Sequence, residues 1–277
     1  MAPSSSPRSG FPRSPILCYV TDRHALEVPA DGIREVVLLD RIREAAAAGV
    51  DWIQVREKDL DAGALVNLAR AAVVNSAGVF QCSSQTASPA GTGGQMLAEK
   101  SGRNVRAEGF AARARMPTRI LVNERLDVAW AASAGGVHLG ETSLPVREVA
   151  ESIARWNRAA GREDFLVGAS CHSSEGAAAA ARDGADYIFF GAVFATPSKA
   201  RFGPPQGLAA LAEICQRTAI PVIAVGGITA ENAAACLEAG CAGVAAIRLF
   251  QQSPGFTERV VQAIWGQLRN SGKDFAR

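Results

Sequence analysis

The sequence predicts an α/β protein of the (β/α)₈ class, a TIM barrel, formed as one domain by residues 16–270. Short runs rich in Val, Ile and Phe alternate eight times with segments of helical periodicity, which is the order of a barrel of parallel strands. The strand-like runs are apolar throughout, as is typical of strands buried on both faces. A length of 277 residues and an apolar content of 48% suit one such barrel with a large core.

The first half of the chain supplies four strand–helix units. The first helical segment stops at Gly49, a residue type that commonly follows the last turn of a helix. The predicted strands are 16–21, 50–55, 119–123 and 136–139, and the predicted helices are 36–49, 62–74, 125–135 and 145–156.

The second half of the chain supplies four more units with the same alternation, which completes the number that a closed barrel needs. The predicted strands are 165–171, 186–191, 220–227 and 242–247, and the predicted helices are 174–184, 207–217, 229–240 and 257–269.

Two segments depart from this alternation. Residues 1–15 are dominated by Ser and Pro, a composition that predicts a disordered tail. Residues 75–116 contain "QCSSQTASPAGTGGQ" and then a charged run, a connection longer than compact domains need. We expect a partly disordered insertion between the second helix and the third strand. A lid or a partner-binding arm is the functional alternative.

The overall composition excludes several classes of protein. A net charge of +2 and an aromatic content of 6% argue against a nucleic-acid partner. No apolar run is long enough to span a bilayer, and the N-terminal segment lacks the apolar core of a signal peptide, so we expect no membrane partner and a cytoplasmic location. The six cysteines form no C-x-x-C pair, which favours buried, reduced thiols over a zinc site.

The end of the second predicted strand, "IQVREK", is the first candidate for a functional site. Catalytic residues of these barrels lie at the carboxyl ends of the strands, and residues two apart in a strand point the same way. Gln54, Arg56 and Lys58 therefore share one side, where an amide and two cations suit a polyanion such as pyrophosphate. A solvated rim is the alternative explanation of the two cations.

Oxygen-bearing side chains follow the third and fourth predicted strands. Asn123 and Glu124 end the third strand, where they suit a substrate amide or a hard cation, although Asn also suits a helix N-cap. Glu141 and Ser143 follow the fourth strand and also suit the start of its helix. His138 lies within the fourth strand, so we expect it to be internal and structural.

The loops after the last four predicted strands complete the set of candidates. His172 follows the fifth strand, where it suits proton transfer near neutral pH or a structural role, and both remain open. Glycines after the seventh strand allow a phosphate to approach backbone N–H groups. The remaining candidates are Thr196, Ser198 and Lys199 after the sixth strand, Gly227 after the seventh and Arg248 after the eighth. A loop with two hydroxyls and a lysine suggests closure over a phosphorylated substrate.

These motifs resemble the thiamin phosphate synthase and thiazole tautomerase superfamily, and the resemblance extends from Ile16 to Gln267. The motifs that carry it are "IQVREK", "LVNERLDVA", "GVHLGE", "GASCHS", "GADYIFFGAVFATPSK", "IPVIAVGGIT" and "AGVAAI". Together they are specific for the superfamily, but they divide its members less cleanly.

A synthase resemblance implies a transferase of the thiamin-phosphate diphosphorylase type (EC 2.5.1.3). Such an enzyme joins hydroxymethylpyrimidine pyrophosphate to thiazole phosphate and releases pyrophosphate in thiamin biosynthesis, so its partners are small phosphorylated molecules. The resemblance places Gln54, Arg56, Lys58, Asn123 and Lys199 at the pyrimidine pyrophosphate, and Thr196, Ser198 and Gly227 at the thiazole phosphate. Of these, Arg56, Lys58 and Lys199 are the expected catalytic residues, with His172 as a further candidate. The resemblance also suggests a homodimer.

The sequence departs from the synthase pattern at the expected magnesium ligands. The family pattern has acids after the third and fourth strands that hold Mg²⁺. Here Glu124 lengthens one acid and Ser143 replaces the other, with Glu141 nearby, so the resemblance implies a weakened or rebuilt Mg²⁺ site formed by these three residues. Arg248 replaces a small hydroxyl residue and, as a cation, still suits a phosphate.

Two alternatives to the synthase remain. In the tautomerase the resemblance gives His172 the role of moving protons on a thiazole carboxylate phosphate, and "NERLDVA" resembles the tautomerase version of the third strand. The intact Gln-x-Arg-x-Lys pattern favours the synthase, because a pyrophosphate site has a reason to keep it. The third hypothesis is a non-catalytic relative that binds thiazole or thiamin phosphate.

Overall fold

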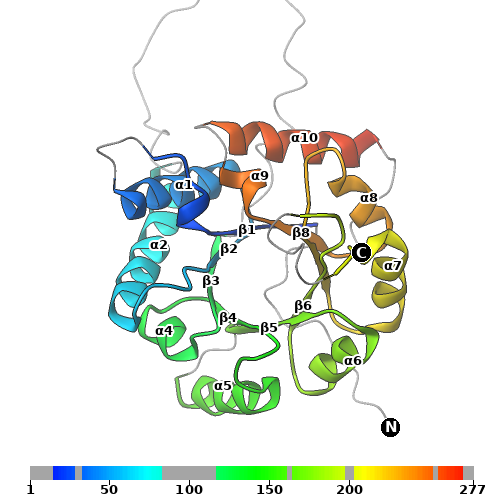
Figure 1. The fold of residues 1–277 in the computed structure, drawn as a ribbon. Coiled ribbons are helices and arrows are strands. Elements are labelled where there is room, and N and C mark those ends of the chain that lie inside the picture. Colours follow the sequence, from blue (N-terminus) through cyan, green and yellow to red (C-terminus); the bar gives the residue numbers. More distant parts are fainter. Residues whose placement is uncertain are drawn as a thin grey trace, which may run out of the picture.

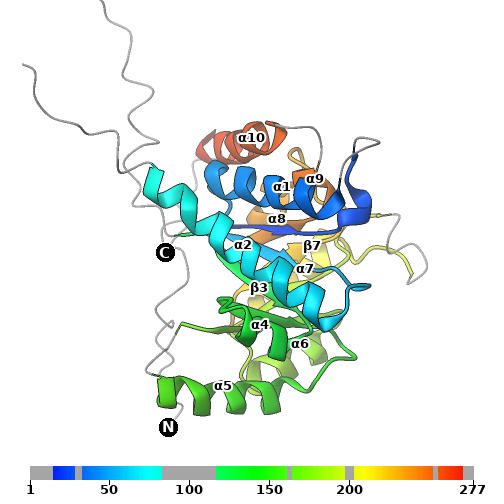
Figure 2. The same cartoon turned by 90° about the vertical axis from the view of Figure 1, so that its left-hand side faces the viewer.

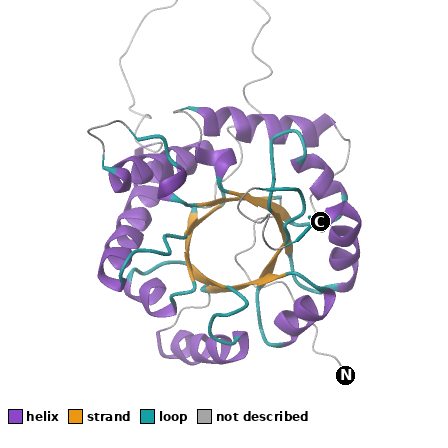
Figure 3. Ribbon diagram, in the orientation of Figure 1, coloured by secondary structure: helices purple, strands orange, loops and turns teal. Residues whose placement is uncertain are grey.

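Eight parallel strands close into a barrel in the computed structural model of the chain, and a ring of helices surrounds them (Figures 1 and 3). The structure describes residues 15–28, 33–82, 117–160, 164–196, 203–251 and 255–270. Neighbouring strands in the sequence pair in order, and β8 returns to pair with β1. The strands are β1 Ile16–Val20, β2 Trp52–Val55, β3 Arg119–Asn123, β4 Gly136–Leu139, β5 Leu166–Cys171, β6 Tyr187–Phe190, β7 Val222–Val225 and β8 Gly243–Ala246.

Each strand is followed by a helix that packs on the outside of the barrel. Figure 2 shows α2 between α1 and α4 on one side of this ring. The helices that complete the eight units are α1 Arg34–Ala48, α2 Ala62–Cys82, α4 Leu126–Ala131, α5 Val146–Ala160, α6 Ser174–Arg182, α7 Gly207–Arg217, α8 Ala233–Glu238 and α10 Phe256–Asn270. The fold class expected from the sequence is confirmed.

The sequence also explains where several helices begin and end. Gly49 adopts a left-handed φ of 89° and its N–H bonds to the last turn of α1, which ends the helix where the sequence predicts. Ser173 caps α6 by accepting a hydrogen bond from the Gly176 N–H. The helix α2 continues through residues 75–82, which the sequence analysis assigned to the insertion. Residues 83–116 and the tail residues 1–14 lie outside the described part of the chain.

Two short elements at the strand ends were not predicted. A 3-10 helix, η1, spans Arg23–Ala25 after β1, and a short helix, α9, spans Arg248–Gln251 directly after β8. Elements of three or four residues carry no measurable periodicity, so the sequence pattern could not reveal them. Both matter because they lie where the functional loops of a barrel are found.

Alternation along the strands divides the apolar residues into two cores. Residues facing outward join the helices in the larger core, with Tyr19, Ile53 and Phe190 among them. Residues facing inward fill the barrel lumen, so the interior is packed rather than open. The lumen core consists of Ile16, Cys18, Val20, Trp52, Leu121, Leu166, Tyr187, Phe189, Ile223 and Ala245.

The lumen core depends on a glycine that leaves room for an aromatic ring. An added Cβ at Gly168 on β5 would lie 2.1 Å from the ring of Tyr187, which is fully buried on β6. We expect Gly168→Ala to destabilise the protein by about 3 kcal/mol, because the ring cannot move in a closely packed lumen. The free energy of unfolding in urea measures this effect.

Gly266→Ala in α10 is the matched control, because an added Cβ there meets no atom within 4 Å. That change should be neutral or slightly stabilising, since Ala favours a helix over Gly by about 0.5–1 kcal/mol. Equal stability of the two variants would contradict the proposed packing of Tyr187 against Gly168.

Within the described part of the chain, no helix combines the length and apolar character needed to cross a membrane.

Candidate active site

The inward-facing residues at the carboxyl end of the barrel form a polar cluster above the apolar lumen. Gln54 is 2% exposed, and its side-chain N–H donates to Asn123 Oδ1 at 2.8 Å. His138 Nε2 lies 2.9 Å from Ser170 Oγ, and its Nδ1 lies 3.2 Å from the Tyr187 hydroxyl. Strand pairing sets Asn123 beside His138. We call Gln54, Asn123, His138 and Ser170 the lumen polar cluster.

Burial determines the charge of His138. The imidazole is 2% exposed, and desolvation lowers its pKa to about 3, with a smaller contribution from the positive charge of Arg56. His138 is therefore neutral at physiological pH. The effect of Arg56 also indicates that the guanidinium lies within electrostatic reach of the lumen.

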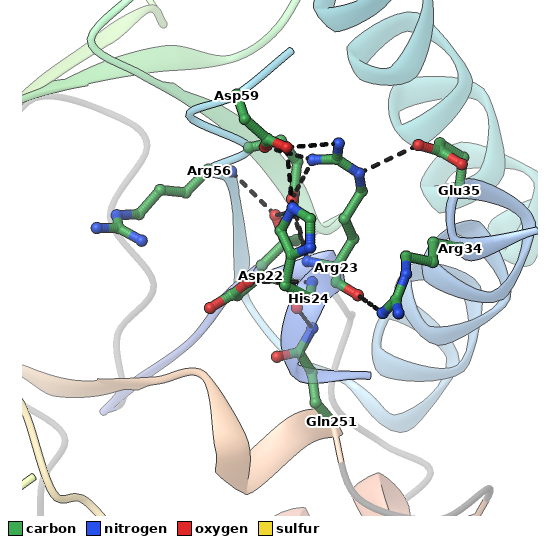
Figure 4. Close-up of polar contacts among 10 residues, drawn as sticks. Asp22, Arg23, His24, Arg34, Glu35, Arg56, Asp59 and Gln251 are labelled. Carbon is green, nitrogen blue, oxygen red and sulfur yellow. Dashed lines mark hydrogen bonds and ion pairs between the residues drawn. The ribbon is translucent and has the colours of Figure 1, made fainter. Parts of the chain in front are cut away.

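Arg56 and Lys58 follow β2 and lie at the mouth of the barrel. Arg56 is half-buried, Lys58 is exposed, and the residue between them, Glu57, is buried. In Figure 4 the Arg56 side chain extends away from the group of charged residues around Arg23. A cavity of about 300 Å³ opens here, lined by Asp22, His24, Arg56, Glu57, Lys58 and Asp59. Exposure therefore increases from Gln54 through Arg56 to Lys58.

Glu124 and Ser143, two of the predicted magnesium ligands, meet at Gly140. Glu124 has a φ of 63°, and its Oε1 lies 2.7 Å from the position of an added Cβ at Gly140. Ser143 Oγ accepts the Gly140 N–H at 2.8 Å. Glu141 is exposed, and its charge acts on Cys171. Among the described residues, no group of three His, Cys, Asp or Glu side chains could hold a metal ion.

His172 directly follows β5 and contacts the loop after β6. Its Nδ1 is hydrogen-bonded to the Gly191 carbonyl oxygen, and its own carbonyl accepts from Gln206 Nε2 at 3.0 Å. These contacts orient the ring at the mouth of the barrel with Nδ1 as the donor. His172 thus joins the loop after β6 to the start of α7.

The loop after β6 packs on the glycine turn after β7. Phe194 N donates to the Gly226 carbonyl at 3.0 Å, and an added Cβ at Gly227 would lie 2.7 Å from Phe194 Cβ and from the Ala195 carbonyl oxygen. Gly227 has a φ of 67°, a region that favours glycine. Asn232 Nδ2 donates a hydrogen bond to the Gly227 carbonyl oxygen at 2.9 Å. Position 227 therefore needs glycine for two reasons. The backbone has a left-handed conformation, and the loop after β6 lies too close for a Cβ atom.

The remaining predicted residues follow the sixth and eighth strands. Thr196 is half-buried near this turn, and Arg248 is exposed at the start of α9. Ser198 and Lys199 lie outside the described residues. The structure brings Gln54 together with Asn123, and Glu124 together with Ser143.

Ser170 is not among the residues expected from the sequence, and His138 is expected there only as an internal residue. The available signal was the alternation of "GASCHS", in which Ser170 lies two residues after Gly168 and shares its inward face of β5. A serine between apolar residues of a buried strand is more polar than packing requires. The pairing with His138 depends on two different strands, so only the barrel reveals it.

Comparisons with known proteins identify the family of the chain. A family model described as thiamine monophosphate synthase matches residues 101–250. A relative from Geobacter sulfurreducens, which carries the same family name, is 38% identical over 88% of this chain and 90% of its own length. A thiamine-phosphate synthase from Roseiflexus castenholzii is 34% identical over 86% of this chain and 82% of its own.

A solved structure has the same fold. The thiamine phosphate pyrophosphorylase from Pyrococcus furiosus superposes with a TM-score of 0.64, covering 93% of this chain and 98% of its own, at 24% sequence identity. At that identity the likeness supports the fold alone. The family-model match and the full-length relatives carry the assignment, and the chain belongs to the thiamine monophosphate synthase family.

Proposed function

We propose that this protein is a transferase that couples hydroxymethylpyrimidine pyrophosphate to thiazole phosphate, forming thiamin phosphate and releasing pyrophosphate. Membership of the family supports the reaction. The observation that carries the proposal is the position of Arg56, half-buried at the barrel mouth and acting electrostatically on His138 in the lumen polar cluster. A cation above the lumen polar cluster suits a ring substrate that carries a pyrophosphate.

The reaction makes simple demands on the protein. The C–O bond to the pyrophosphate breaks first, and its electron pair leaves with the pyrophosphate. The thiazole nitrogen then donates its lone pair to the pyrimidine carbocation to form the new C–N bond. Such chemistry needs cations at the leaving group and a site that excludes water. Arg56, Lys58 and Lys199 are proposed to supply the cations.

The lumen polar cluster is proposed to receive the pyrimidine. Gln54 and Asn123 offer amide donors and acceptors, although Gln54 Nε2 already donates one hydrogen bond to Asn123 Oδ1. His138 remains neutral because its pKa is lowered to about 3 by burial. A neutral imidazole suits a site where positive charge develops on the substrate, since an imidazolium there would repel the carbocation.

The thiazole phosphate is proposed to bind over β7 and β8. Barrels often hold a phosphate at the loops after these strands and at a short extra helix, and α9 occupies that place here. Thr196, Ser198 and the backbone of Gly227 would donate hydrogen bonds. Arg248 would add a positive charge in place of a small hydroxyl.

Magnesium is proposed to bind with few protein ligands. Glu124 Oε1 and Ser143 Oγ lie 2.7 and 3.4 Å from the same point, the position of an added Cβ at Gly140, so one carboxylate and one hydroxyl suit a cation, and Glu141 lies next in the chain. Mg²⁺ commonly takes one or two carboxylates and completes its shell with water and substrate phosphates. When bound, it would neutralise charge on the pyrophosphate.

A turnover assay with both phosphorylated substrates tests the proposed function. The full chain with Mg²⁺ should form thiamin phosphate and pyrophosphate in equal amounts, and EDTA should reduce the rate. No product at high enzyme concentration would overturn the proposal. Conversion of a thiazole carboxylate phosphate tautomer, lost in His172→Ala, would instead identify an isomerase. Binding of thiazole phosphate with neither activity would indicate a non-catalytic relative.

Lys199→Ala is expected to reduce kcat about 100-fold, while the Kd for thiazole phosphate changes less than threefold. The reason is that removal of one group that stabilises developing charge costs about 10²–10³ in kcat. Single-turnover kinetics and calorimetric titration of thiazole phosphate measure the two quantities. An unchanged kcat would show that the loop after β6 does not reach the leaving group.

A further inference from the structure

Glu57 is a buried carboxylate between the two cations of the "REK" sequence. Alternation along the extended chain turns its side chain away from the barrel mouth, behind Arg56 and Lys58. The Glu57 side chain is only 1% exposed, whereas Asp59, two residues later, is 51% exposed. A buried carboxylate is costly unless it is paired and hydrogen-bonded, so its partners explain why it is there.

Thr21 links Glu57 directly to the backbone of Arg56. The Thr21 hydroxyl donates to Glu57 Oε1 at 2.6 Å, and Thr21 Oγ1 accepts the backbone N–H of Arg56 at 2.9 Å. Thr21 is fully buried at the end of β1. This hydroxyl therefore fixes both the side chain of Glu57 and the backbone at the point where the chain leaves β2.

Arg23 closes the other side of the carboxylate. Its backbone N–H donates to Glu57 Oε2 at 3.0 Å and its Nη1 to the same oxygen at 3.3 Å. The guanidinium also forms a bidentate pair with Asp59 at 2.6 and 2.8 Å (Figure 4). Arg23 thereby binds the residues directly before and after Lys58, Glu57 and Asp59. Its positive charge balances the negative charge that Glu57 brings close to Arg56.

Neighbouring elements hold Arg23 in place. Glu35 of α1 pairs with Arg23 Nε at 3.1 Å, and Arg34 Nη1 donates to the Arg23 carbonyl at 3.3 Å. Gln251 of α9 donates to the Asp22 carbonyl at 2.8 Å. The short helix η1 is thus anchored from α1 and from α9, and it presents a rigid partner to the loop after β2.

We propose that Thr21, Arg23 and Glu57 are positioning residues that hold the Arg56–Lys58 backbone so that both cations face the pyrophosphate. The inference rests on the proposed function, because it names the substrate group that the positioned cations bind. None of the three residues needs to touch the substrate. They act through the loop, by holding its backbone.

The test uses Thr21→Val and Glu57→Gln in the full-length protein, with inorganic pyrophosphate and thiazole phosphate as calorimetric probes. Each variant should weaken pyrophosphate binding about tenfold, as expected when a hydrogen bond that orders the loop is lost. The Kd for thiazole phosphate should stay within twofold of the wild type. Thr21→Ser should restore pyrophosphate binding, since it keeps the hydroxyl.

Matched controls make the same chemical changes elsewhere. Thr118→Val removes a hydroxyl that donates to the Val50 carbonyl at the opposite end of the barrel, and Glu213→Gln removes an exposed ion pair with Arg217 on α7. Neither control should change pyrophosphate binding. These controls separate loss of positioning from a general loss of stability.

Several outcomes would overturn the inference. Pyrophosphate binding that is unchanged in both Thr21→Val and Glu57→Gln would do so, as would an equal loss of both ligands or a failure of Thr21→Ser to restore binding. If Thr21→Val does not fold, Glu57→Gln decides the matter. Wild-type protein that binds pyrophosphate but forms no thiamin phosphate would refute the proposed function and leave the positioning role standing.

Discussion

Arg56→Ala is expected to lower kcat/KM for the pyrimidine pyrophosphate by about 1,000-fold, at the upper end of the range for loss of one charge-stabilising group. A guanidinium can form two parallel hydrogen bonds to a phosphate, and it keeps its charge in a half-buried position. Both features matter more as the pyrophosphate gains negative charge on leaving. Steady-state kinetics with the thiazole phosphate held at saturation measure the loss.

Arg56→Lys and Arg217→Ala make this prediction specific. Lysine keeps the charge but cannot form the bidentate contact, so Arg56→Lys should recover only part of the rate. Arg217 forms an exposed pair with Glu213 on α7, away from the strand ends, and its removal should leave kcat/KM unchanged. A kcat/KM in Arg56→Ala within threefold of the wild type would exclude Arg56 from the site.

Acidification is expected to destabilise the folded protein because of His138. Its pKa is about 3 in the folded state, against an ordinary value of about 6.5 in the unfolded chain. Below pH 6.5 the unfolded state therefore binds a proton that the folded state does not bind. The free energy of unfolding should fall by about 1.4 kcal/mol per pH unit, or about 2 kcal/mol between pH 6.5 and pH 5.

The sign and the range of this effect can be checked directly. The free energy of unfolding is not reduced by His138 above pH 6.5. The reduction grows as the pH falls and stops growing below about pH 3. Urea unfolding between pH 7 and pH 5 stays largely above the range where unfolded carboxyls titrate. His138→Asn removes the titrating ring and should flatten this part of the profile. Parallel profiles for wild type and variant would contradict the assignment.

The number and order of the strands could be read from the sequence because the lumen and the helix layer both demand apolar residues. Each strand therefore appears as an apolar run. Glycines such as Gly49 mark where the helix before the next strand ends. The faces on which the residues at the barrel mouth lie could also be read from the sequence. Once β2 is placed, alternation sends Gln54 and Arg56 to one face and Glu57 to the other.

The partners of those residues could not be predicted in the same way. Nothing in "IQVREK" reveals that Gln54 meets Asn123, or that Thr21 joins Glu57 to the Arg56 backbone, because each contact joins residues 35 or more positions apart. The unpredicted helix η1, too short for any periodicity, supplies Arg23.

The sequence by itself determined the barrel, the face of each strand and the residue types at its mouth. Only the tertiary structure decided which of these groups are buried, which are charged and what holds them. His138 is neutral because closure of the barrel removes it from water, and Glu57 is tolerated because Arg23 and Thr21 surround it. Burial and pairing are properties of the closed barrel, since they depend on neighbours that chain order does not bring together.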